Sequence, residues 1–323
     1  MSQSIFSSDF KPEPYWWDRT PRPVPLEDSL PDQADVVIVG SGYTGLNAGL
    51  VTSRAGLTTV IVDAEQAGWG CSSRNGGQVS GEVKPSYKAL ARLHGTEQAY
   101  AIIAEARTAL RWIGDFIDEE GIDCDYRHCG RFHAAHSAQQ FTSQQEEFKS
   151  QVKGLERDGH LVNKAQLKNE VDSPYYHGGL VINEHASLDP ARYHQGLYER
   201  ALASGCHVVD NCRVENVVRN SDGFNLATVK GQIRAGKVLV ATSGYTGSAT
   251  PWQQRRIIPI GSYMLATEAL EPDLARSLIP NDRVVSDTRK LVVYYRLSPD
   301  GRRILFGDGY RTKRPTQFAV RDR

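Results

Sequence analysis

Short apolar runs alternate with amphipathic stretches along the first 250 residues of the chain. Residues 35–40, Asp-Val-Val-Ile-Val-Gly, predict a central parallel strand that is buried on both faces. Residues 44–55 have the composition of a helix, and Gly56 suits the position just after a helix end. Residues 59–63 form a second β-branched run, so the pattern predicts a strand, a helix and a strand joined by short connections.

Three further helices are predicted from the spacing of apolar residues and from glycines at their ends. They cover residues 96–120, residues 138–158 and the segment from Asp189 to Gly205. The last of them has an aspartate as N-cap, a proline in its first turn and a buried stripe of Tyr193, Leu197 and Ala201. Short strands are predicted at residues 207–210 and 237–241.

The pattern changes after Pro259. Longer strands are predicted at residues 259–267, 291–297 and 303–307, and residues 298–301, Ser-Pro-Asp-Gly, predict a turn between two of them. Strands that are joined by turns predict an antiparallel sheet, which we assign to a second domain.

Residues 1–32 form a proline-rich arm before the first predicted strand. It contains prolines at positions 12, 14, 21, 23, 25 and 31. Each proline fixes φ and removes a hydrogen-bond donor, so the arm is predicted to be extended and not helical. Tyr15, Trp16 and Trp17 interrupt the arm, and we interpret these rings as an anchor that packs the arm onto the body of the protein.

Composition narrows the classes of function. The 323 residues are enough for two domains, and 38 basic and 38 acidic residues give a formal net charge of zero. Because the basic excess that recruits nucleic acid is missing, no nucleic-acid partner is expected. The sequence shows neither a run of 18 or more apolar residues nor an N-terminal signal pattern, so we predict no transmembrane segment and a cytoplasmic location. The five cysteines are predicted to be reduced thiols.

The clearest motif lies where the first predicted strand meets the first predicted helix. Residues 40–45, Gly-Ser-Gly-Tyr-Thr-Gly, match the G-x-G-x-x-G fingerprint of dinucleotide-binding folds, and Asp63 follows 23 residues after the first glycine. Gly40 permits a tight turn, Gly42 lets a pyrophosphate approach the backbone, and Gly45 lets the helix pack against the strand. The helix N-terminus would face the phosphates, and Asp63 would accept hydrogen bonds from ribose hydroxyls. The fingerprint fits NAD and FAD alike, and a glycine turn in another parallel α/β fold is the alternative interpretation.

The loop after Asp63 separates these cofactors. Residues 68–78 read Gly-Trp-Gly-Cys-Ser-Ser-Arg-Asn-Gly-Gly-Gln, and here the sequence resembles the D-amino-acid oxidase superfamily of FAD enzymes, within it the γ-glutamylputrescine oxidoreductase-like branch, which oxidises amines and amino acids. In that branch this loop runs beneath the flavin. The resemblance extends over almost the whole chain, and the matching segments include residues 188–193, 237–245, 262–268 and 295–302. The resemblance to this superfamily therefore implies that FAD is the cofactor.

The resemblance also implies the residues of the site. The implied cofactor-binding residues are Gly40, Ser41, Gly42, Tyr43, Thr44, Gly45, Asp63, Ser72, Arg74, Asn75, Gly76, Gly77, Gln78, Val214, Ser243 and Gly244. The candidates for catalytic contact with the substrate are Tyr263, Tyr295 and Arg296, because they match strands of the family's substrate domain; aromatic packing and a surface arginine are the alternative. In such an enzyme a hydride passes from the carbon beside the amine to flavin N5, and the protein orients the substrate.

Three positions depart from the loop of the family. Cys71 stands where alanine is usual, Ser73 where glycine is usual, and Asp63 where glutamate is commoner. None of these changes argues against FAD. A cysteine near a flavin can form a covalent link, but we interpret Cys71 as a small buried thiol.

Together these features predict an α/β protein. It combines a Rossmann-like FAD-binding domain, with a parallel sheet and helices, and a second α+β substrate domain with a mainly antiparallel sheet. The predicted boundaries are residues 1–32 for the arm, 33–121 and 185–250 for the FAD-binding domain, and 122–184 and 251–323 for the substrate domain. Members of the family carry a further glycine-rich segment near the C-terminus that covers the flavin. Residues 302–323 contain seven basic and two acidic residues and no such segment, so we expect a fragment or a frameshifted product.

The predicted function is FAD-dependent oxidation of a C–N bond in an amine or amino acid, such as γ-glutamylputrescine, with oxygen or another electron acceptor as partner. The alternatives are a sarcosine- or glycine-oxidase-like enzyme and a catalytically silent fragment; the loop at residues 68–78 disfavours a NAD-dependent dehydrogenase. A cluster of thiols and imidazoles has no zinc-site spacing, so no metal site is predicted there. Its members are Cys124, His128, Cys129, His133 and His136.

Overall fold

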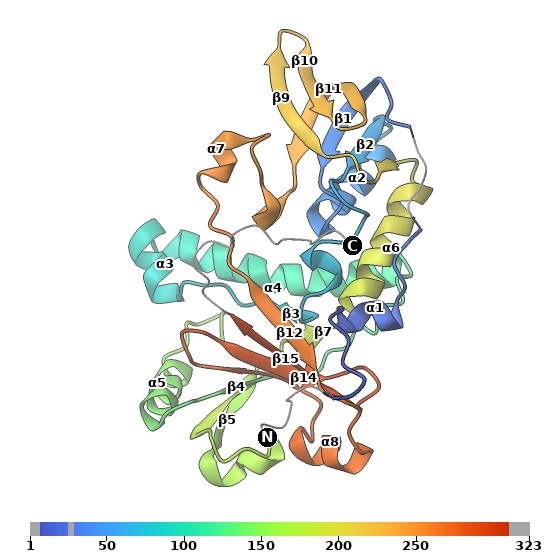
Figure 1. The fold of residues 1–323 in the computed structure, drawn as a ribbon. Coiled ribbons are helices and arrows are strands. Elements are labelled where there is room, and N and C mark those ends of the chain that lie inside the picture. The colour runs from blue at the N-terminus through green and yellow to red at the C-terminus, as the bar shows by residue number, and fades with distance from the viewer. Residues whose placement is uncertain (1–6, 25–28, 310–323) are drawn as a thin grey trace. The chain divides into compact units, whose positions relative to one another are not determined.

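A computed structural model gives the positions of residues 7–24 and 29–309 (Figure 1). These residues form two compact units, each built from separated segments of the chain. Unit 1 holds residues 7–15, 76–189 and 262–309, and unit 2 holds residues 16–24, 29–75 and 190–261. The basic tail after residue 309, on which the expectation of a fragment partly rests, lies outside the described residues.

Unit 2 is built on a six-stranded sheet in the order β8-β2-β1-β11-β10-β9. Its strands are β1 (Gln33–Val39), β2 (Thr59–Val62), β8 (His207–Val209), β9 (Val214–Asn220), β10 (Gly223–Thr228) and β11 (Gly231–Val240). The pairs β11-β1, β1-β2 and β2-β8 are parallel, whereas β9, β10 and β11 pair antiparallel. Val37 and Ile38 of β1 are fully buried, which confirms the predicted central strand. The sequence did not predict β9, β10 or the first half of β11.

The helices of unit 2 follow the predicted strand-helix-strand order. They are α1 (Tyr15–Arg19), whose first residue belongs to unit 1, α2 (Tyr43–Arg54), α6 (Pro190–Ala203) and α7 (Pro251–Gln254), with 3-10 turns η1 (Cys71–Ser73) and η3 (Ser243–Tyr245). Helix α2 contacts β1 and β2 and packs against α6 (Figure 1). Gly56 follows α2 with φ of 81°, and the predicted stripe of Tyr193, Leu197 and Ala201 on α6 is buried, so both helix predictions are confirmed.

Unit 1 is built on a seven-stranded sheet in the order β12-β15-β14-β13-β4-β6-β5. Its strands are β12 (Ser262–Ala266), β15 (Ile304–Gly309), β14 (Val293–Leu297), β13 (Val284–Asp287), β4 (Arg131–Ala134), β6 (Gly178–Ile182) and β5 (Gly159–Asn163). All neighbours pair antiparallel except β13 and β4, which confirms the mainly antiparallel second sheet. A two-stranded sheet joins β3 (Gln78–Ser80) and β7 (His185–Ser187).

The helices of unit 1 are α3 (Tyr87–His94), α4 (Thr96–Glu119), α5 (Ala138–Lys149) and α8 (Pro272–Leu278), with the 3-10 helix η2 (Lys164–Asn169). One face of the large sheet packs on a core that includes Phe132, Val181 and Val285. In the described part of the chain, none of the helices is long and apolar enough to cross a membrane.

Three features differ from the sequence predictions. The arm is helical at Tyr15–Arg19, because no proline lies between Pro14 and Pro21. Helix α5 ends at Lys149 instead of residue 158, since Gly154 has φ of 83°, a left-handed conformation that a helix cannot contain. Residues 76–121 lie in unit 1 and not with the nucleotide-binding sheet, because α3 packs on α4 and α4 contacts β3.

Candidate functional site

The glycine turn between β1 and α2 leaves no room for side chains. A Cβ on Gly45 would lie 1.8 Å from the carbonyl oxygen of Gly40, and a Cβ on Gly40, whose φ is 108°, would lie 2.7 Å from the carbonyl oxygen of Ala241. A Cβ on Gly42 would lie 2.9 Å from the hydroxyl of Ser72. The two approaches to backbone oxygens require glycine at positions 40 and 45, so the turn has the close backbone packing that a pyrophosphate-binding loop requires.

The acid at the end of β2 is tied to this turn. Asp63 Oδ2 accepts hydrogen bonds from the backbone N–H and the hydroxyl of Ser41, both at 2.7 Å. Asp63 Oδ1 accepts from the N–H of Glu65 at 3.0 Å. A carboxylate has about four acceptor positions, so Asp63 can hold the turn and still accept from one ribose hydroxyl.

The part of the predicted flavin loop that belongs to unit 2 contacts the start of α2. Together with the two residues before it, this part is called loop 66–75. The N–H of Tyr43 donates to the hydroxyl of Ser72 at 3.2 Å, and the side-chain amide of Asn75 donates to the hydroxyl of Tyr43 at 3.2 Å. The structure thus brings Tyr43, Ser72 and Asn75 together beside the glycine turn. Thr44, in the first turn of α2, is exposed.

Arg74 lies among aromatic rings of the same unit. Its guanidinium carbon is 4.6 Å from the ring centroid of Trp69, and the group donates to the hydroxyl of Tyr245 at 3.4 Å. A guanidinium over a ring stays exposed at its edge, where it can meet an anion. Cys71 in this loop is exposed, so the prediction of a buried thiol is wrong. The 3-10 turn places the cysteine on the outside of the loop, whereas Ser73 is buried.

Two buried titratable side chains hold the site, and the sequence analysis missed both. His194 Nε2 lies 2.8 Å from the carbonyl oxygen of Ser41, and its ring fills the space where a Cβ on Gly68 would lie, 2.6 Å away. Burial lowers the pKa of His194 to about 4, so the neutral ring donates from Nε2 at neutral pH. Asp210 Oδ1 accepts from the N–H of Ala67 at 2.7 Å, and burial raises the pKa of Asp210. A sequence signal existed for His194, because it falls on the buried stripe of α6.

Three predicted cofactor residues lie at the edges of this arrangement. Val214 is 9% exposed and begins β9, two residues after Cys212, whose N–H donates to the carbonyl of Asp63 at 2.6 Å. Ser243, with φ of 47°, and Gly244 form the exposed turn after β11. The structure places them just beyond Ala241, the residue that contacts the glycine turn.

The remaining cofactor candidates, Gly76, Gly77 and Gln78, belong to unit 1. A Cβ on Gly76 would lie 2.9 Å from the ring of Tyr294. The carbonyl of Gly77 accepts from Arg296 Nη1 at 2.9 Å, and Gln78 begins β3. Glycine at position 76 therefore lets this segment lie against β14.

Neighbouring side chains of strand β14 point to opposite faces of the sheet, so the predicted substrate residue Tyr295 and its neighbour Tyr294 lie on different faces. Tyr295 faces the core, where its ring stacks on Phe306 with 6.0 Å between centroids and its hydroxyl donates to that of Tyr176 at 3.3 Å. Tyr294 faces the opposite side, over Gly76, and its hydroxyl lies 3.1 Å from that of Ser262. Tyr294, which the sequence analysis did not select, thus lies beside Gly76, and Tyr295 does not.

The other two substrate candidates have different surroundings. Arg296 is 2% exposed, and its guanidinium donates to the carbonyls of Gly77 and Leu188 at 2.9 and 3.0 Å. We therefore correct its assignment, since a guanidinium that holds two main-chain segments is a structural group. Tyr263, on the edge strand β12, is 50% exposed.

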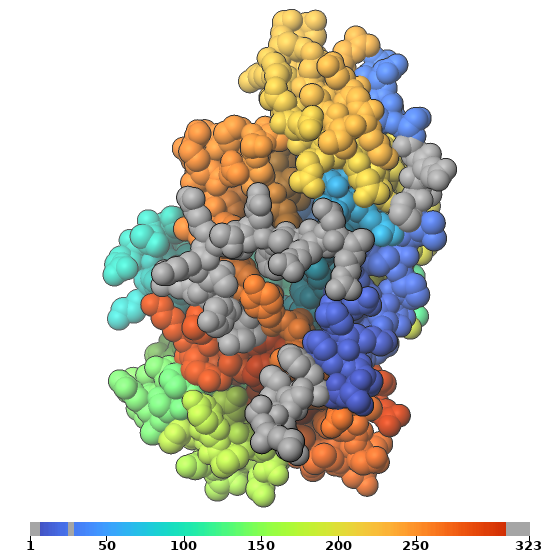
Figure 2. Space-filling view, in the orientation of Figure 1, coloured from blue at the N-terminus to red at the C-terminus, as the bar shows by residue number. Residues whose placement is uncertain are grey.

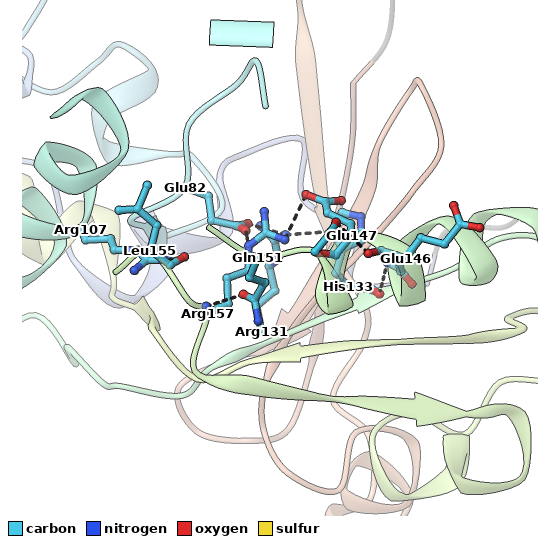
Figure 3. Close-up of polar contacts among 11 residues, drawn as sticks. Glu82, Arg107, Arg131, His133, Glu146, Glu147, Gln151, Leu155 and Arg157 are labelled. Atoms are coloured by element: carbon cyan, nitrogen blue, oxygen red, sulfur yellow. Dashed lines mark hydrogen bonds and ion pairs between the residues drawn. The ribbon is translucent and has the colours of Figure 1, made fainter. Parts of the chain in front are cut away.

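A charged network lies on the same face of the unit 1 sheet as Tyr294. Ser286 pairs with Tyr294 on one side and with His133 on the other, so these three side chains and Arg131 share a face. Glu82 joins two cations, because its Oε2 lies 2.7 Å from Arg131 Nη2 and its Oε1 lies 3.2 Å from Nε of Arg157 (Figure 3).

His133 completes this network. Its Nδ1 lies 2.8 Å from Nη2 of Arg131. Burial and then the charge of Arg131 lower the pKa of His133 to about 3, so the ring is neutral and Nδ1 accepts the hydrogen bond. Within residues 7–24 and 29–309, no group of three or more His, Cys, Asp or Glu side chains could hold a metal ion.

Comparisons with known proteins agree with this geometry. A family model described as FAD dependent oxidoreductase matches residues 35–322. The chain is 32% identical over 280 residues to gamma-glutamylputrescine oxidoreductase of Escherichia coli (strain K12), with 85% of this chain and 64% of that protein covered. It is 27% identical over 324 residues to the probable oxidoreductase OrdL of Rhizobium meliloti (strain 1021), with 98% of this chain and 74% of that protein covered.

A solved structure, that of glycine oxidase from Geobacillus kaustophilus, superposes with a TM-score of 0.67 at 17% sequence identity, over 87% of this chain and 73% of that chain. At this identity the likeness establishes the fold. The chain spans 64% of the length of the Escherichia coli relative.

Proposed function

Because the chain belongs to the family of FAD-dependent oxidoreductases, we propose that unit 2 holds the ADP half of FAD and that the protein oxidises a C–N bond of an amine or amino acid. The observation that carries the proposal is the glycine turn: a Cβ at position 40, 42 or 45 would approach a neighbouring oxygen to within 2.9 Å. Glycine at these positions keeps side chains away from the N-terminus of α2, where a pyrophosphate would lie.

The residues present fit the two ends of an ADP group. Asp63, with one acceptor position left after its bonds to Ser41 and Glu65, would bind a ribose hydroxyl. Ser72 and Arg74 supply a hydroxyl and a cation for the phosphates. Val214 would lie beside the adenine, and Ser243 and Gly244 after β11 remain cofactor candidates, as do Gly76, Gly77 and Gln78.

When bound, FAD supplies the acceptor for a hydride from the carbon beside the amine. An amine gives up this hydride only in its neutral form. The sheet face that carries Tyr294 also carries Arg131, whose charge already helps to keep His133 neutral. An amine bound against this face would be kept neutral in the same way. Tyr294 would orient it by a hydrogen bond, and Tyr263 is the second candidate for substrate contact.

For the substrate we propose γ-glutamylputrescine or a similar amine, which the 32% identity to gamma-glutamylputrescine oxidoreductase supports. A glycine- or sarcosine-oxidase-like activity is the second candidate, and the fold likeness to glycine oxidase favours it.

The absorption spectrum of the purified chain tests the cofactor. Flavin bands are expected, with FAD in the supernatant after acid precipitation. Bands that stay with the pellet would instead indicate a covalent link, for which the exposed Cys71 is the first candidate. A folded chain that stays colourless with added FAD would refute the proposal.

Anaerobic bleaching of the bound flavin then tests the substrate. The panel contains γ-glutamylputrescine, putrescine, sarcosine and glycine. Bleaching by the first of these supports the leading proposal, and bleaching by sarcosine or glycine alone supports the second candidate. If none of the four bleaches the flavin, both substrate proposals fail.

A further inference from the structure

Two tryptophans of the N-terminal arm hold the end of loop 66–75. The indole N–H of Trp16 donates to the main-chain oxygen of Asn75 at 2.8 Å, and Trp16 is only 2% exposed. The indole N–H of Trp17 donates to the hydroxyl of Ser73 at 2.9 Å. Two neutral donors from one turn of helix thus fix the last three residues of the loop.

Arg22 holds the start of the same loop. Its guanidinium donates to the carbonyl of Gln66 at 3.0 Å and to that of Ala67, and the side chain of Gln66 donates to the carbonyl of Pro23 in return. The guanidinium also lies over the ring of Trp17, 4.8 Å from its centroid. Burial lowers the pKa of Arg22 to about 10, so it is still a cation at neutral pH.

The ring of Trp17 reaches Arg74 as well. The guanidinium carbon of Arg74 lies 5.8 Å from the Trp17 centroid and 4.6 Å from that of Trp69. A guanidinium between two rings is confined to few rotamers, because only some keep it over both faces. Trp17 therefore limits where the charge of Arg74 can lie.

The loop contains only turns and local bonds. They are a turn from Gln66 to Trp69, the 3-10 turn Cys71–Ser73, and side-chain bonds from Ser73 to Gly68 and from Asn75 to Cys71 and Ser72, so none of its residues belongs to a longer helix or a strand. A loop of this kind loses conformational freedom when it binds a ligand, unless other groups have already ordered it. The arm contacts both ends of the loop and lies at the molecular surface, where it is drawn in blue (Figure 2).

We propose that residues 16–23 of the arm are a clamp that orders loop 66–75 for FAD, with Trp17 as the positioning residue for Arg74. The inference rests on the proposed FAD site. The family match begins at residue 35, so it does not cover the clamp. A loop that the clamp has ordered in advance loses less entropy when FAD binds, and FAD therefore binds more tightly.

The test compares three Trp→Phe variants of the full chain. W16F and W17F remove one indole donor each and keep an aromatic ring. W252F is the matched control, because Trp252 of α7 is 59% exposed and its ring stacks on Arg256. Hydrogen exchange of residues 66–75 is measured without FAD, and the Kd for FAD is measured by flavin fluorescence.

W16F and W17F are expected to speed exchange in loop 66–75 and to raise the Kd by about 5- to 10-fold, the loss of one hydrogen bond. Exchange in β1 and β2 and all values for W252F are expected to match the wild type. W17L, which removes the ring as well, is made in the wild type and in an R74M background. If Trp17 acts through Arg74, W17L raises the Kd clearly less in the R74M background than in the wild type, a coupling that general destabilisation would not produce.

Unchanged exchange in loop 66–75 would overturn the clamp. Faster exchange with an unchanged Kd would overturn its role in binding FAD, and additive effects of W17L and R74M would overturn the role of Trp17. If the wild type binds no FAD, the proposed function fails, and with it the clamp's role in cofactor binding, whereas the exchange data still decide whether the arm holds the loop. If the more deeply buried W16F fails to fold, W17F carries the test.

Discussion

Loop 66–75 in unit 2 and the sheet face around Arg131 in unit 1 are both polar, but different forces hold them. Loop 66–75 is held by hydrogen bonds to single main-chain and hydroxyl groups: Trp16 and Trp17 donate to its end, Arg22 donates to its start, and the neutral His194 donates to the adjoining turn. The unit 1 face is held by ions, with Glu82 between two arginines (Figure 3).

Hydrogen bonds to a loop and ion pairs on a sheet face are suited to different tasks. Hydrogen bonds to the main chain and close glycine contacts fix the path of the backbone. An ion network fixes a charge and changes the pKa of its neighbours, as it does for His133. The first suits holding a cofactor, and the second suits tuning a substrate amine.

The largest loss of stability is expected from a substitution in the glycine turn between β1 and α2, where the backbone packing is closest. In G45A the new Cβ would lie 1.8 Å from the carbonyl of Gly40, so the turn must break, and we expect a loss of at least about 4 kcal/mol in the free energy of unfolding. The control is G247A, because nothing lies within 4 Å of a Cβ there. Urea unfolding measures both, and equal midpoints for the two variants would refute this account of the turn.

Acid is expected to weaken the neutral contact of His194. Its pKa is about 4 in the folded chain and about 6.5 when unfolded, so between these values the unfolded state binds more protons. The stability is present above pH 6.5 and falls by about 3 kcal/mol as the pH drops to about 4.

H194Q removes this titration and should lessen the decline in unfolding free energy between pH 6.5 and 4 by about 3 kcal/mol, while the buried His133 and His185, whose pKa values are lowered to about 3, still contribute to the decline. H160Q is the control, since His160 is exposed. If H194Q and the wild type lose stability in parallel over this range, His194 is not the group that titrates.

The ion network is expected to depend on Glu82 far more than on Glu147. E82Q leaves Arg131, whose side chain is 15% exposed, and Arg157 without their shared carboxylate, and should cost about 2 kcal/mol of stability. E147Q removes a 59% exposed partner of Arg157 and should cost less than about 0.5 kcal/mol. Thermal unfolding distinguishes them, and similar costs would show that the network acts as an exposed set of pairs.

The smallest effects are expected from removing the hydroxyl groups of Tyr294 and Tyr295, which are neighbours on β14. Y294F should lower kcat/KM for the amine about 5- to 10-fold with unchanged stability, since it removes one hydrogen bond to substrate. Y295F should instead lower stability by about 1 kcal/mol with kcat/KM unchanged, because its hydroxyl bonds Tyr176 in the core. The opposite assignment of effects would place the substrate on the other face of the sheet.

The sequence by itself predicted the features that depend on local chain geometry. The β1-α2-β2 unit, the glycine turn, the stripe of α6 and the antiparallel strands after residue 259 all follow from periodicity and from residues that permit one backbone conformation. These signals lie within a few residues of one another, so no distant partner is needed to recognise them.

The tertiary structure alone decided which of Tyr294 and Tyr295 faces Gly76, because the side of a strand that meets the core depends on its pairing with β13 and β15. It also decided that Arg296 is structural, that Glu82 meets Arg131 and that the arm holds loop 66–75. Each of these contacts joins residues 49 to 219 positions apart. Their energies depend on distances of a few ångströms, and the fold sets those distances between segments that the sequence keeps far apart.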